Sequence, residues 1–459
     1  MLTGFVSYGI RRRRALNLPG LGKLGYRKAQ GKGEQVADIG LEEALIVGAV
    51  RTPLGKQGGA LSPVRPDDLA ALVLQALMER TGVLPEEIED VYMGCANQAG
   101  EDNRNVARMA LLLAGFPEEV SGTTINRLCG SGLDAVANAA RAIMLGEAHA
   151  YIGAGVESMS RAPWAVPKPE RGFPTGSMTM YDTTLGWRFV NPKMEERGYT
   201  DSLGQTAENL AEERYAVTSE QERPEGLARK YDISREKQDR FALRSHQKAV
   251  EATDEKRFRE EIVSVAVKTR KSEELVEADE VPRRDTSQER LAKLPPAFKE
   301  GGTVTAGNSS PLNDGAAATL VVSGEFARAH GLKPIARIRS MAVAGVPPQV
   351  MGIGPVLATK KALERAGLSL DDVGLIELNE AFAAQVLAVL YEWGMDPEDE
   401  RLNPNGGAIA LGHPIGCSGA RILTTLLHEM GRRPEVQFGM ASMCIGVGQG
   451  IAMIVEKAA

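Results

Sequence analysis

A cysteine between a short extended run and a helical pattern is the first residue in this sequence with clear chemical potential. Cys129 is followed by Gly130, Ser131 and Gly132, and apolar residues recur at helical spacing from Leu133 onward. The spacing predicts a strand-to-helix turn with Cys129 beside the helix N-terminus. Free N–H groups and the helix dipole at that position lower a thiol pKa and favour the nucleophilic thiolate. The alternative is a small buried cysteine in a tight turn.

Three further clusters contain residues suited to catalysis. Asn379 stands where a predicted strand gives way to a helix, so its amide could hold a water or an oxyanion, or simply cap the helix. His413 lies in a glycine-rich loop and not on an apolar helix face. Cys444 is a second cysteine followed by glycines, including Gly446, which leave the backbone open to close contact.

The same residues raise the question of a metal or nucleotide site. His413 and Cys417 have a plausible interval for zinc ligands, but the sequence has no CxxC pair and no evident fourth ligand. The glycines at 446–450 are not spaced as in a dinucleotide-binding fingerprint, and no P-loop is present. We therefore predict no metal site, and the residues offer no convincing phosphate-binding loop.

Length and composition bound the class of protein. The chain has 459 residues, which predicts two or three domains at the usual ~100–200 residues per domain. The net charge of −6 gives no reason to expect nucleic acid as a partner. No apolar run approaches the ~18 residues that span a bilayer, so no membrane span is predicted. Four widely separated cysteines indicate a reducing compartment and a cytoplasmic location.

The elements that must position these clusters alternate between strands and helices, which favours an α/β fold with a helix-covered, parallel sheet. In the first part of the chain they are predicted at 44–49, 67–80, 90–94, 105–114 and 150–152. The alternation resumes after Gly301 and includes a helix at 381–393. Residues 158–291 are rich in charge, proline and aromatics, and we interpret them as an excursion outside the sheets.

Two stretches echo one another. Residues 129–136 can be laid over residues 416–423, and each is followed by a helix and a short strand that contains Gly153 or Gly439. A fold of two similar halves, related by a pseudo-twofold axis, would explain the match. Gly416 stands in the second half where Cys129 stands in the first, so one half would carry the nucleophile and the other would supply helping groups.

Taken together, the clusters resemble the thiolase family from about Leu41 to the C-terminus. The shared motifs are Asn126-Arg127-Leu128-Cys129-Gly130-Ser131-Gly132, Thr303-Val304-Thr305-Ala306-Gly307-Asn308-Ser309-Ser310, Asn379-Glu380-Ala381-Phe382, Gly412-His413-Pro414 and Cys444-Ile445-Gly446-Val447-Gly448. One histidine with two cysteines also matches thiolases better than ketosynthases, which typically pair two histidines with one cysteine.

The resemblance implies a thiolase-like five-layer αβαβα sandwich of two similar halves plus a loop domain. Its N-terminal half would comprise 41–158 and 292–322, and its C-terminal half 323–459. Residues 159–291 would form the loop domain that binds CoA and contributes to oligomerisation. A homodimer or homotetramer is expected from the family.

The resemblance also implies an acetyl-CoA C-acyltransferase that cleaves 3-ketoacyl-CoA with CoA in fatty acid β-oxidation. Cys129 would attack the keto carbonyl, and His413 would take the thiol proton. Cys444 would protonate the acetyl-CoA carbanion. His413 and a water on Asn379 would bind the enolate oxygen, and the N–H groups of Cys129 and Gly446 would bind the thioester oxygen.

Substrate positions follow from the same resemblance. Ser310 and Leu203 match positions that bind the substrate, and CoA is a substrate, so no cofactor is needed. The segment 181–192 is similar to thiolases that act on longer or dicarboxylic acyl groups, including 3-oxoadipyl-CoA. Within it, Arg188 could pair with a substrate carboxylate or be a surface arginine.

Three alternatives remain beside the degradative hypothesis. The first two are a biosynthetic acetoacetyl-CoA thiolase and a 3-oxoadipyl-CoA thiolase. The third is a non-catalytic relative that binds acyl-CoA or lipid, against which the intact catalytic motifs argue. Residues 1–40 are expected to be a basic, disordered extension, and 216–231 an insertion that lengthens a surface helix or loop.

Overall fold

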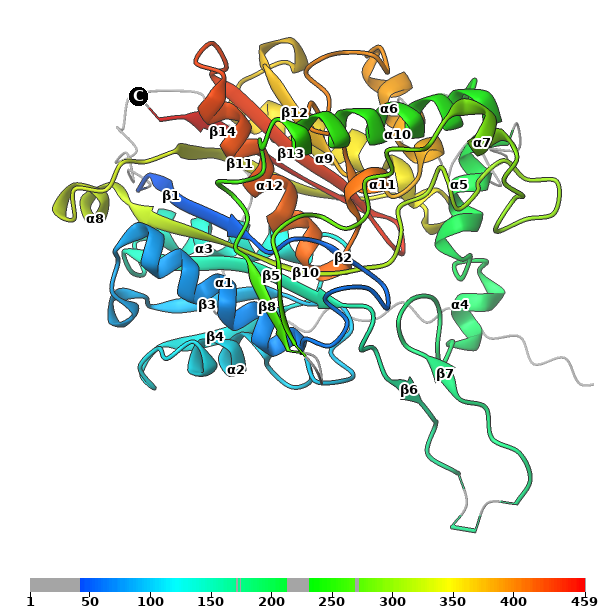
Figure 1. Ribbon diagram of the computed structural model, residues 1–459, viewed down its shortest axis with the longest axis horizontal. Helices are drawn as coiled ribbons and strands as arrows, with labels where there is room; N and C mark the ends of the chain where they lie inside the picture. Colours follow the sequence, from blue (N-terminus) through cyan, green and yellow to red (C-terminus); the bar gives the residue numbers. More distant parts are fainter. Residues whose placement is uncertain (1–41, 171, 174, 213–230, 269–271, 459) are drawn as a thin grey trace, which may run out of the picture. The chain divides into compact units, whose positions relative to one another are not determined.

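The computed structural model describes residues 42–170, 172–173, 175–212, 231–268 and 272–458. The predicted extension at 1–40 and all but the last residue of the predicted insertion at 216–231 lie outside the described residues. The described strands form one large sheet and two small hairpins, with helices on the faces of the large sheet (Figure 1).

The first half of the fold is a mixed sheet with the strand order β4-β3-β5-β10-β1. Its strands are β1 (Ala44–Arg51), β3 (Asp90–Gly94), β4 (Ser121–Ile125), β5 (Ala150–Ser158) and β10 (Asn313–Ser323). β4, β3 and β5 run parallel, whereas β10 is antiparallel to both β5 and β1. Helices α1 (Pro66–Thr81) and α2 (Val106–Leu113) bury their apolar faces against its outer side.

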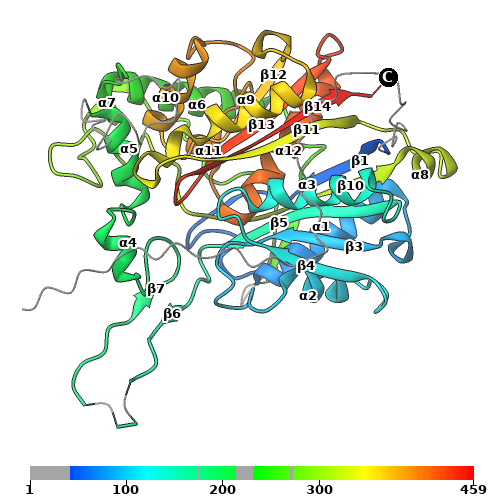
Figure 2. The same ribbon diagram turned by 180° about the vertical axis from the view of Figure 1, so that it is seen from behind.

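The second half repeats this order as β12-β13-β14-β11. Its strands are β11 (Ala336–Gly345), β12 (Leu375–Leu378), β13 (Phe438–Ile445) and β14 (Gln449–Lys457). A parallel bridge between Ile376 and Leu402 marks the place that β4 occupies in the first half. Helices α9 (Gly354–Ala366) and α10 (Ala383–Trp393) cover the outer side, and α9 lies along β11 and β14 (Figure 2).

Two helices fill the space between the halves. They are α3 (Ser131–Met144) and α12 (Ile415–Arg432), and their first turns lie in the two stretches that echo each other in the sequence. Their buried residues form one apolar cluster with the inner faces of both half-sheets. The layers are therefore α1 and α2, the first half-sheet, α3 and α12, the second half-sheet, and α9 and α10. This confirms the predicted five-layer α/β sandwich of two similar halves.

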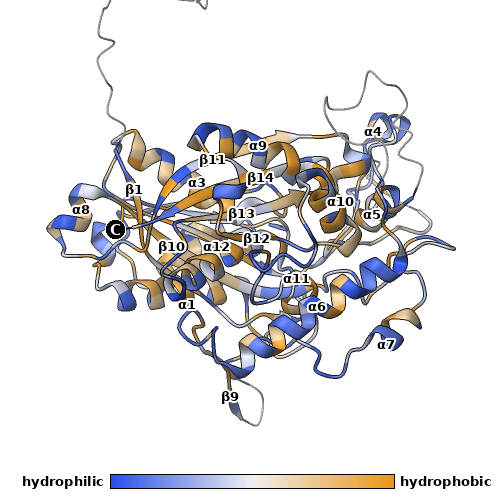
Figure 3. Ribbon diagram, turned by 90° about the horizontal axis from the view of Figure 1, so that it is seen from above, coloured by the Kyte–Doolittle hydropathy of each residue, from blue (hydrophilic) through white to orange (hydrophobic). Residues whose placement is uncertain are grey.

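The excursion contributes no strand to the large sheet among its described residues. Its elements are β6 (Trp164–Ala165), β7 (Tyr181–Asp182), α4 (Pro192–Glu196), α5 (Leu203–Ala211), α6 (Arg235–Asp254), β8 (Val265–Lys268), β9 (Glu273–Val276) and α7 (Gln288–Ala292). α6 and α7 display mostly hydrophilic residues on their outer surface (Figure 3). The other short elements are β2 (Gly55–Lys56), η1 (Pro85–Glu87), α8 (Gly324–Ala329), η2 (Pro348–Ile353), η3 (Leu370–Asp372) and α11 (Ala408–Leu411).

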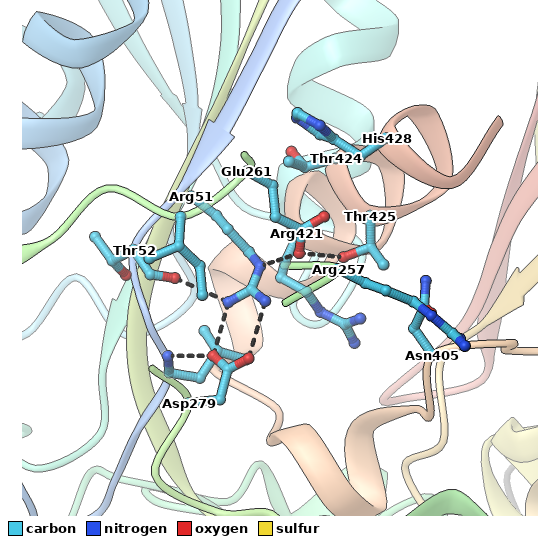
Figure 4. A network of polar contacts seen from close by, with 12 residues as sticks. Arg51, Thr52, Arg257, Glu261, Asp279, Asn405, Arg421, Thr424, Thr425 and His428 are labelled. Carbon is cyan, nitrogen blue, oxygen red and sulfur yellow. Dashed lines mark hydrogen bonds and ion pairs between the residues drawn. The ribbon is translucent and has the colours of Figure 1, made fainter. Parts of the chain in front are cut away.

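Arg51, at the end of β1, ties the excursion to the core (Figure 4). Its buried guanidinium donates to Glu261 at 2.6 Å and to both oxygens of Asp279 at 2.7 and 2.9 Å. Thr425 of α12 donates to the same Glu261 oxygen at 3.1 Å. Breaking a buried pair by removing one partner typically costs about 3–5 kcal/mol. The network therefore fixes the positions of β1, the excursion and α12 relative to one another.

The central helices approach so closely that only glycine fits at their contact. A Cβ atom on Gly132 of α3 would lie 2.7 Å from the backbone nitrogen of Ala420, and one on Gly419 of α12 would lie 2.3 Å from that of Leu133. Neighbouring backbone cannot retreat from such a contact without moving a helix.

We expect Gly419→Ala to lower the free energy of unfolding by about 1–3 kcal/mol, the usual effect of overpacking a core. The matched control is Gly431→Ala on the same helix, where an added Cβ meets no atom within 4 Å. Alanine's higher helix propensity predicts no loss there, and at most a gain of about 1 kcal/mol. Guanidinium unfolding followed by far-UV circular dichroism measures both. Equal midpoints for the two variants would contradict the close approach.

Candidate active site

Cys129 sits in the turn between β4 and α3, as the spacing predicts, and is 6% exposed. The turn forces Leu128 to a φ of +47°, a conformation that costs a non-glycine residue about 1–3 kcal/mol. Ser131 holds Leu128 in this conformation, because its hydroxyl accepts from the Arg127 N–H at 2.8 Å and donates to the Leu128 carbonyl at 2.6 Å. The strained turn fixes where the sulfur lies.

A cavity of about 200 Å³ opens beside this turn. Three predicted site residues line it, namely Cys129, Gly446 and Leu203. The other lining residues come from the Cys129 turn, the loop after β3, β5, the segment after β7, α5, η2, the start of α12 and the turn after β13. His413, Asn379, Cys444 and Ser310 do not line the cavity, and their positions are described below.

Burial raises the pKa of the Cys129 thiol to about 11. Hydrogen bonds from the backbone N–H groups of Gly446 and of Cys129 itself act in the opposite direction, and the nearby Glu157 carboxylate raises the pKa further. The prediction that the helix N-terminus lowers this pKa is therefore wrong for the resting protein, because desolvation outweighs the N–H groups. The same two N–H groups are those predicted to bind the thioester oxygen.

Cys444 lies at the end of β13 and is 1% exposed. Burial raises its thiol pKa, and the charge that Cys129 acquires on ionisation raises it further. The backbone N–H of Gly446, two residues after Cys444, donates to the Cys129 sulfur, so the two cysteines belong to one site. A thiolate on Cys129 therefore disfavours a thiolate on Cys444.

His413 precedes α12 and is 8% exposed. Its backbone N–H donates to Asn313 at 3.0 Å, and its ring Nδ1 lies 2.5 Å from the Ser418 hydroxyl. That hydroxyl donates its one proton to the Pro414 carbonyl, so Nδ1 must be the protonated nitrogen. Nε2 then carries a free lone pair, and it has no protein partner. Burial lowers the pKa of the ring to about 3, so the ring is neutral at rest and its Nε2 lone pair is unprotonated.

Asn379 follows β12 and is fully buried. Its backbone N–H donates to Ser442 at 3.0 Å, whereas neither polar atom of its side chain has a hydrogen-bond partner. The helix-cap interpretation is wrong, because Phe382 occupies the N-cap of α10. Such an amide is ready to hold a water or a substrate oxygen. Ser310 joins the same loop through its N–H, which donates to the Ala381 carbonyl at 3.0 Å.

Two residues of the site escaped sequence reasoning. Ser418, which sets the His413 tautomer, stands five positions after it, a spacing that a loop-to-helix junction makes plausible. Glu157 is 2% exposed and lies near the end of an otherwise apolar strand. A carboxylate in such a strand is the sequence signal that could have identified it. It accepts from the N–H groups of Ala96 at 2.9 Å, Asn97 at 3.1 Å and Gly416 at 2.7 Å. Burial raises its pKa to about 7.

Cys95, Asp102 and Glu157 place three potential metal-ligand atoms within 4.8 Å of one another in the described part of the chain. Their chemistry does not suit a metal. Burial raises the pKa of Cys95, so its sulfur stays a thiol, and it lies 3.6 Å from an Asp102 oxygen as a hydrogen-bond donor. Both Glu157 oxygens are already occupied by backbone donors. We assign no metal to this cluster.

Comparison with known proteins identifies the family. Residues 44–325 match the thiolase N-terminal domain, and residues 332–457 match the thiolase C-terminal domain. The chain is a member of the thiolase family. Its two halves are thus those of a thiolase, a family of acyltransferases. No helix in the described part of this thiolase combines the length and apolar character needed to cross a bilayer.

Two bacterial relatives of this thiolase are similar over nearly their whole length. The beta-ketoadipyl-CoA thiolase of Pseudomonas aeruginosa is 53% identical over 420 residues, which cover 90% of this chain and 99% of that protein. The 3-oxoadipyl-CoA/3-oxo-5,6-dehydrosuberyl-CoA thiolase of Escherichia coli (strain K12) is 53% identical over 419 residues, covering 91% and 100%. The crystal structure of human mitochondrial 3-ketoacyl-CoA thiolase in complex with CoA matches with a TM-score of 0.81 and 39% identity, covering 92% and 99%.

We expect the His413 ring of this thiolase not to titrate between about pH 5 and about pH 9, because burial holds its pKa far below that range. His330 is the control, because the Phe326 carbonyl and Glu87 raise its pKa above the ordinary value. Histidine-selective NMR with ¹³C-labelled protein measures both rings, and His413→Gln and His330→Gln assign the signals. A His413 signal that shifts with a midpoint near the free value of about 6.5 would contradict this site.

Proposed function

We propose that this thiolase cleaves 3-oxo acyl-CoA thioesters whose acyl chain ends in a carboxylate, with 3-oxoadipyl-CoA as the substrate. Attack by CoA would give acetyl-CoA and succinyl-CoA. Two relatives that are 53% identical carry names with a six-carbon 3-oxo dicarboxylic acyl group, which supports this substrate class. The single observation that carries the proposal is an arginine in the wall of the Cys129 cavity.

That arginine is Arg188. It is half-buried and lines the cavity together with Cys129. Its Nη1 donates to the Thr183 carbonyl at 3.4 Å, and no carboxylate among the described residues forms an ion pair with it. A guanidinium binds a carboxylate through two parallel, charge-assisted hydrogen bonds. The surface-arginine interpretation is less favoured, because a surface side chain would not line the cavity of the nucleophile.

The chemistry begins with the proton of Cys129. His413 Nε2 accepts it as the sulfur attacks the 3-keto carbon. The bond between the second and third acyl carbons then breaks, the succinyl group remains on Cys129, and Cys444 protonates the departing acetyl-CoA carbanion. His413 and a water on Asn379 stabilise the enolate oxygen, and the N–H groups of Cys129 and Gly446 stabilise the thioester oxygen. CoA then takes the acyl group, so the reaction needs no metal or bound cofactor.

The other hypotheses are less favoured. The names of the relatives support the 3-oxoadipyl-CoA alternative better than the initial fatty-acid β-oxidation hypothesis or a biosynthetic acetoacetyl-CoA thiolase. The free His413 Nε2 and the unpartnered Asn379 amide argue against a non-catalytic acyl-CoA-binding protein. The division at 41–158 with 292–322, 159–291 and 323–459, the homo-oligomer and the cytoplasmic location remain predictions.

Wild-type enzyme should cleave 3-oxoadipyl-CoA with a kcat/KM at least about tenfold above that for 3-oxohexanoyl-CoA, because one charge-assisted hydrogen-bond pair contributes about 1.5–3 kcal/mol. The two substrates differ only in the terminal carboxylate. Loss of the magnesium-enolate absorbance measures the rates. An equal or reversed preference would overturn the proposed substrate class.

Arg188→Met should remove most of that preference by raising the KM for 3-oxoadipyl-CoA, whereas Arg197→Met, an exposed arginine outside the cavity, should keep it. If both variants retained the wild-type ratio, Arg188 would not be the group that binds the carboxylate.

Cys444→Ala should separate the two half-reactions. Acyl exchange between Cys129 and CoA needs no carbanion and should proceed within about tenfold of wild type, whereas thiolysis should fall by about 10²–10⁴, the usual contribution of a general acid. Isotope exchange between acetyl-CoA and labelled CoA measures the first reaction. Cys129→Ala, which lacks the nucleophile, should lose both. Near-normal thiolysis by Cys444→Ala would contradict its role.

A further inference from the structure

We propose that Asn97 is a positioning residue for substrate selection. It holds the segment that carries Arg188 against the wall of the Cys129 cavity, and so fixes the span between the nucleophile and the bound carboxylate. The inference rests on the proposed recognition of a substrate carboxylate by Arg188. Recognition of the carboxylate then depends on a chain of hydrogen bonds that positions Arg188, and not on the arginine side chain alone.

The chain starts at the side-chain amide of Asn97. Its Nδ2 donates to the carbonyl oxygen of Thr183 at 2.9 Å and lies 3.3 Å from its hydroxyl. Thr183 is only 2% exposed, and its hydroxyl donates to the Pro163 carbonyl at 2.6 Å. The carbonyl that receives the amide of Asn97 also receives Nη1 of Arg188. Asn97 and Arg188 therefore meet on one backbone oxygen.

Asn97 is itself held in place by further hydrogen bonds. Its backbone N–H donates to one oxygen of Glu157 at 3.1 Å, and its side-chain oxygen accepts from the Ala99 N–H at 3.1 Å. The other Glu157 oxygen accepts from the N–H of Gly416 at 2.7 Å, near the start of the helix that follows His413. One buried carboxylate thus connects the histidine loop to Asn97, and through it to Arg188.

The segment that leads to Thr183, as far as the structure describes it, has few hydrogen bonds to the rest of the protein. Between β6 and β7 it carries exposed apolar side chains, including Phe173 at 95%, and Figure 1 shows these two strands projecting away from the large sheet. On the far side of Thr183, the Thr184 hydroxyl lies 3.5 Å from the Met159 carbonyl, and the Trp187 ring donates to the Asp201 carbonyl at 3.2 Å. Thr183 is the buried residue of this segment, and the side chain of Asn97, in the cavity wall, donates a hydrogen bond to it.

Removing the amide should leave Arg188 present but imprecisely placed. Binding of a carboxylate by a guanidinium depends on the geometry of two parallel hydrogen bonds, so the loss should appear in the KM for the dicarboxylic substrate. A residue that acted only on stability would change the kinetics of both substrates alike.

The test compares 3-oxoadipyl-CoA with 3-oxohexanoyl-CoA in the full-length enzyme. Asn97→Leu keeps the volume and adds no charge, and it should raise the KM for 3-oxoadipyl-CoA about tenfold more than the KM for 3-oxohexanoyl-CoA. Asn97→Ala serves as a second variant should leucine impair folding. The matched control is Asn103→Leu, an exposed asparagine whose amide donates to the Gly100 carbonyl, and it should keep the wild-type ratio.

A double mutant separates the inference from the function on which it rests. In an Arg188→Met background, Asn97→Leu should have no further effect on the ratio, because Asn97 acts through Arg188. A wild-type enzyme without preference for 3-oxoadipyl-CoA would overturn the proposed function itself. A wild-type preference that Arg188→Met abolishes and Asn97→Leu preserves would overturn only the role of Asn97, as would equal changes in KM for both substrates.

Discussion

Backbone contact between α3 and α12 is the constraint on which the catalytic arrangement depends. Gly132 and Gly419 let the two helices touch where side chains would keep them apart. Each helix begins just after a turn that carries a candidate site residue, Cys129 before α3 and His413 before α12. Because the contact lies near both N-termini, the pseudo-symmetry of the halves brings turns from distant parts of the sequence to one end of the layer.

Burial then sets the electrostatics of the site. Desolvation disfavours every charged form, so the Cys129 thiol is protonated and the His413 ring is neutral at rest. In the proposed mechanism, moving a proton from the Cys129 sulfur to the His413 imidazole would create an ion pair in a medium where opposite charges attract strongly. The N–H groups of Cys129 and Gly446 favour the sulfur anion, and the proposal assigns them the thioester oxygen as well. The site would thus stabilise charge that develops during the reaction.

Local patterns predicted much of this molecule and missed what depends on distant packing. The Cys129 turn follows from apolar periodicity, the excursion outside the sheets from composition, and the repeated halves from the echo between 129–136 and 416–423, whereas the five layers were implied by the resemblance. The thiol pKa does not, because desolvation arises from layers assembled from the whole chain. The same holds for Glu157, whose three N–H donors come from two other segments. Asn379 shows the limit most directly, since its side-chain atoms lack partners that a helix cap would have supplied.

The protonated state of Cys129 bears on its sensitivity to oxidation. Peroxides and electrophilic metabolites attack the thiolate far faster than the thiol, and they need access to the sulfur. The Cys129 sulfur is 6% exposed and its pKa is raised to about 11. In the absence of substrate it is therefore neither ionised nor readily reached by an oxidant. On the proposed mechanism, the sulfur would therefore resist oxidation between turnovers and would become a thiolate only when substrate is bound.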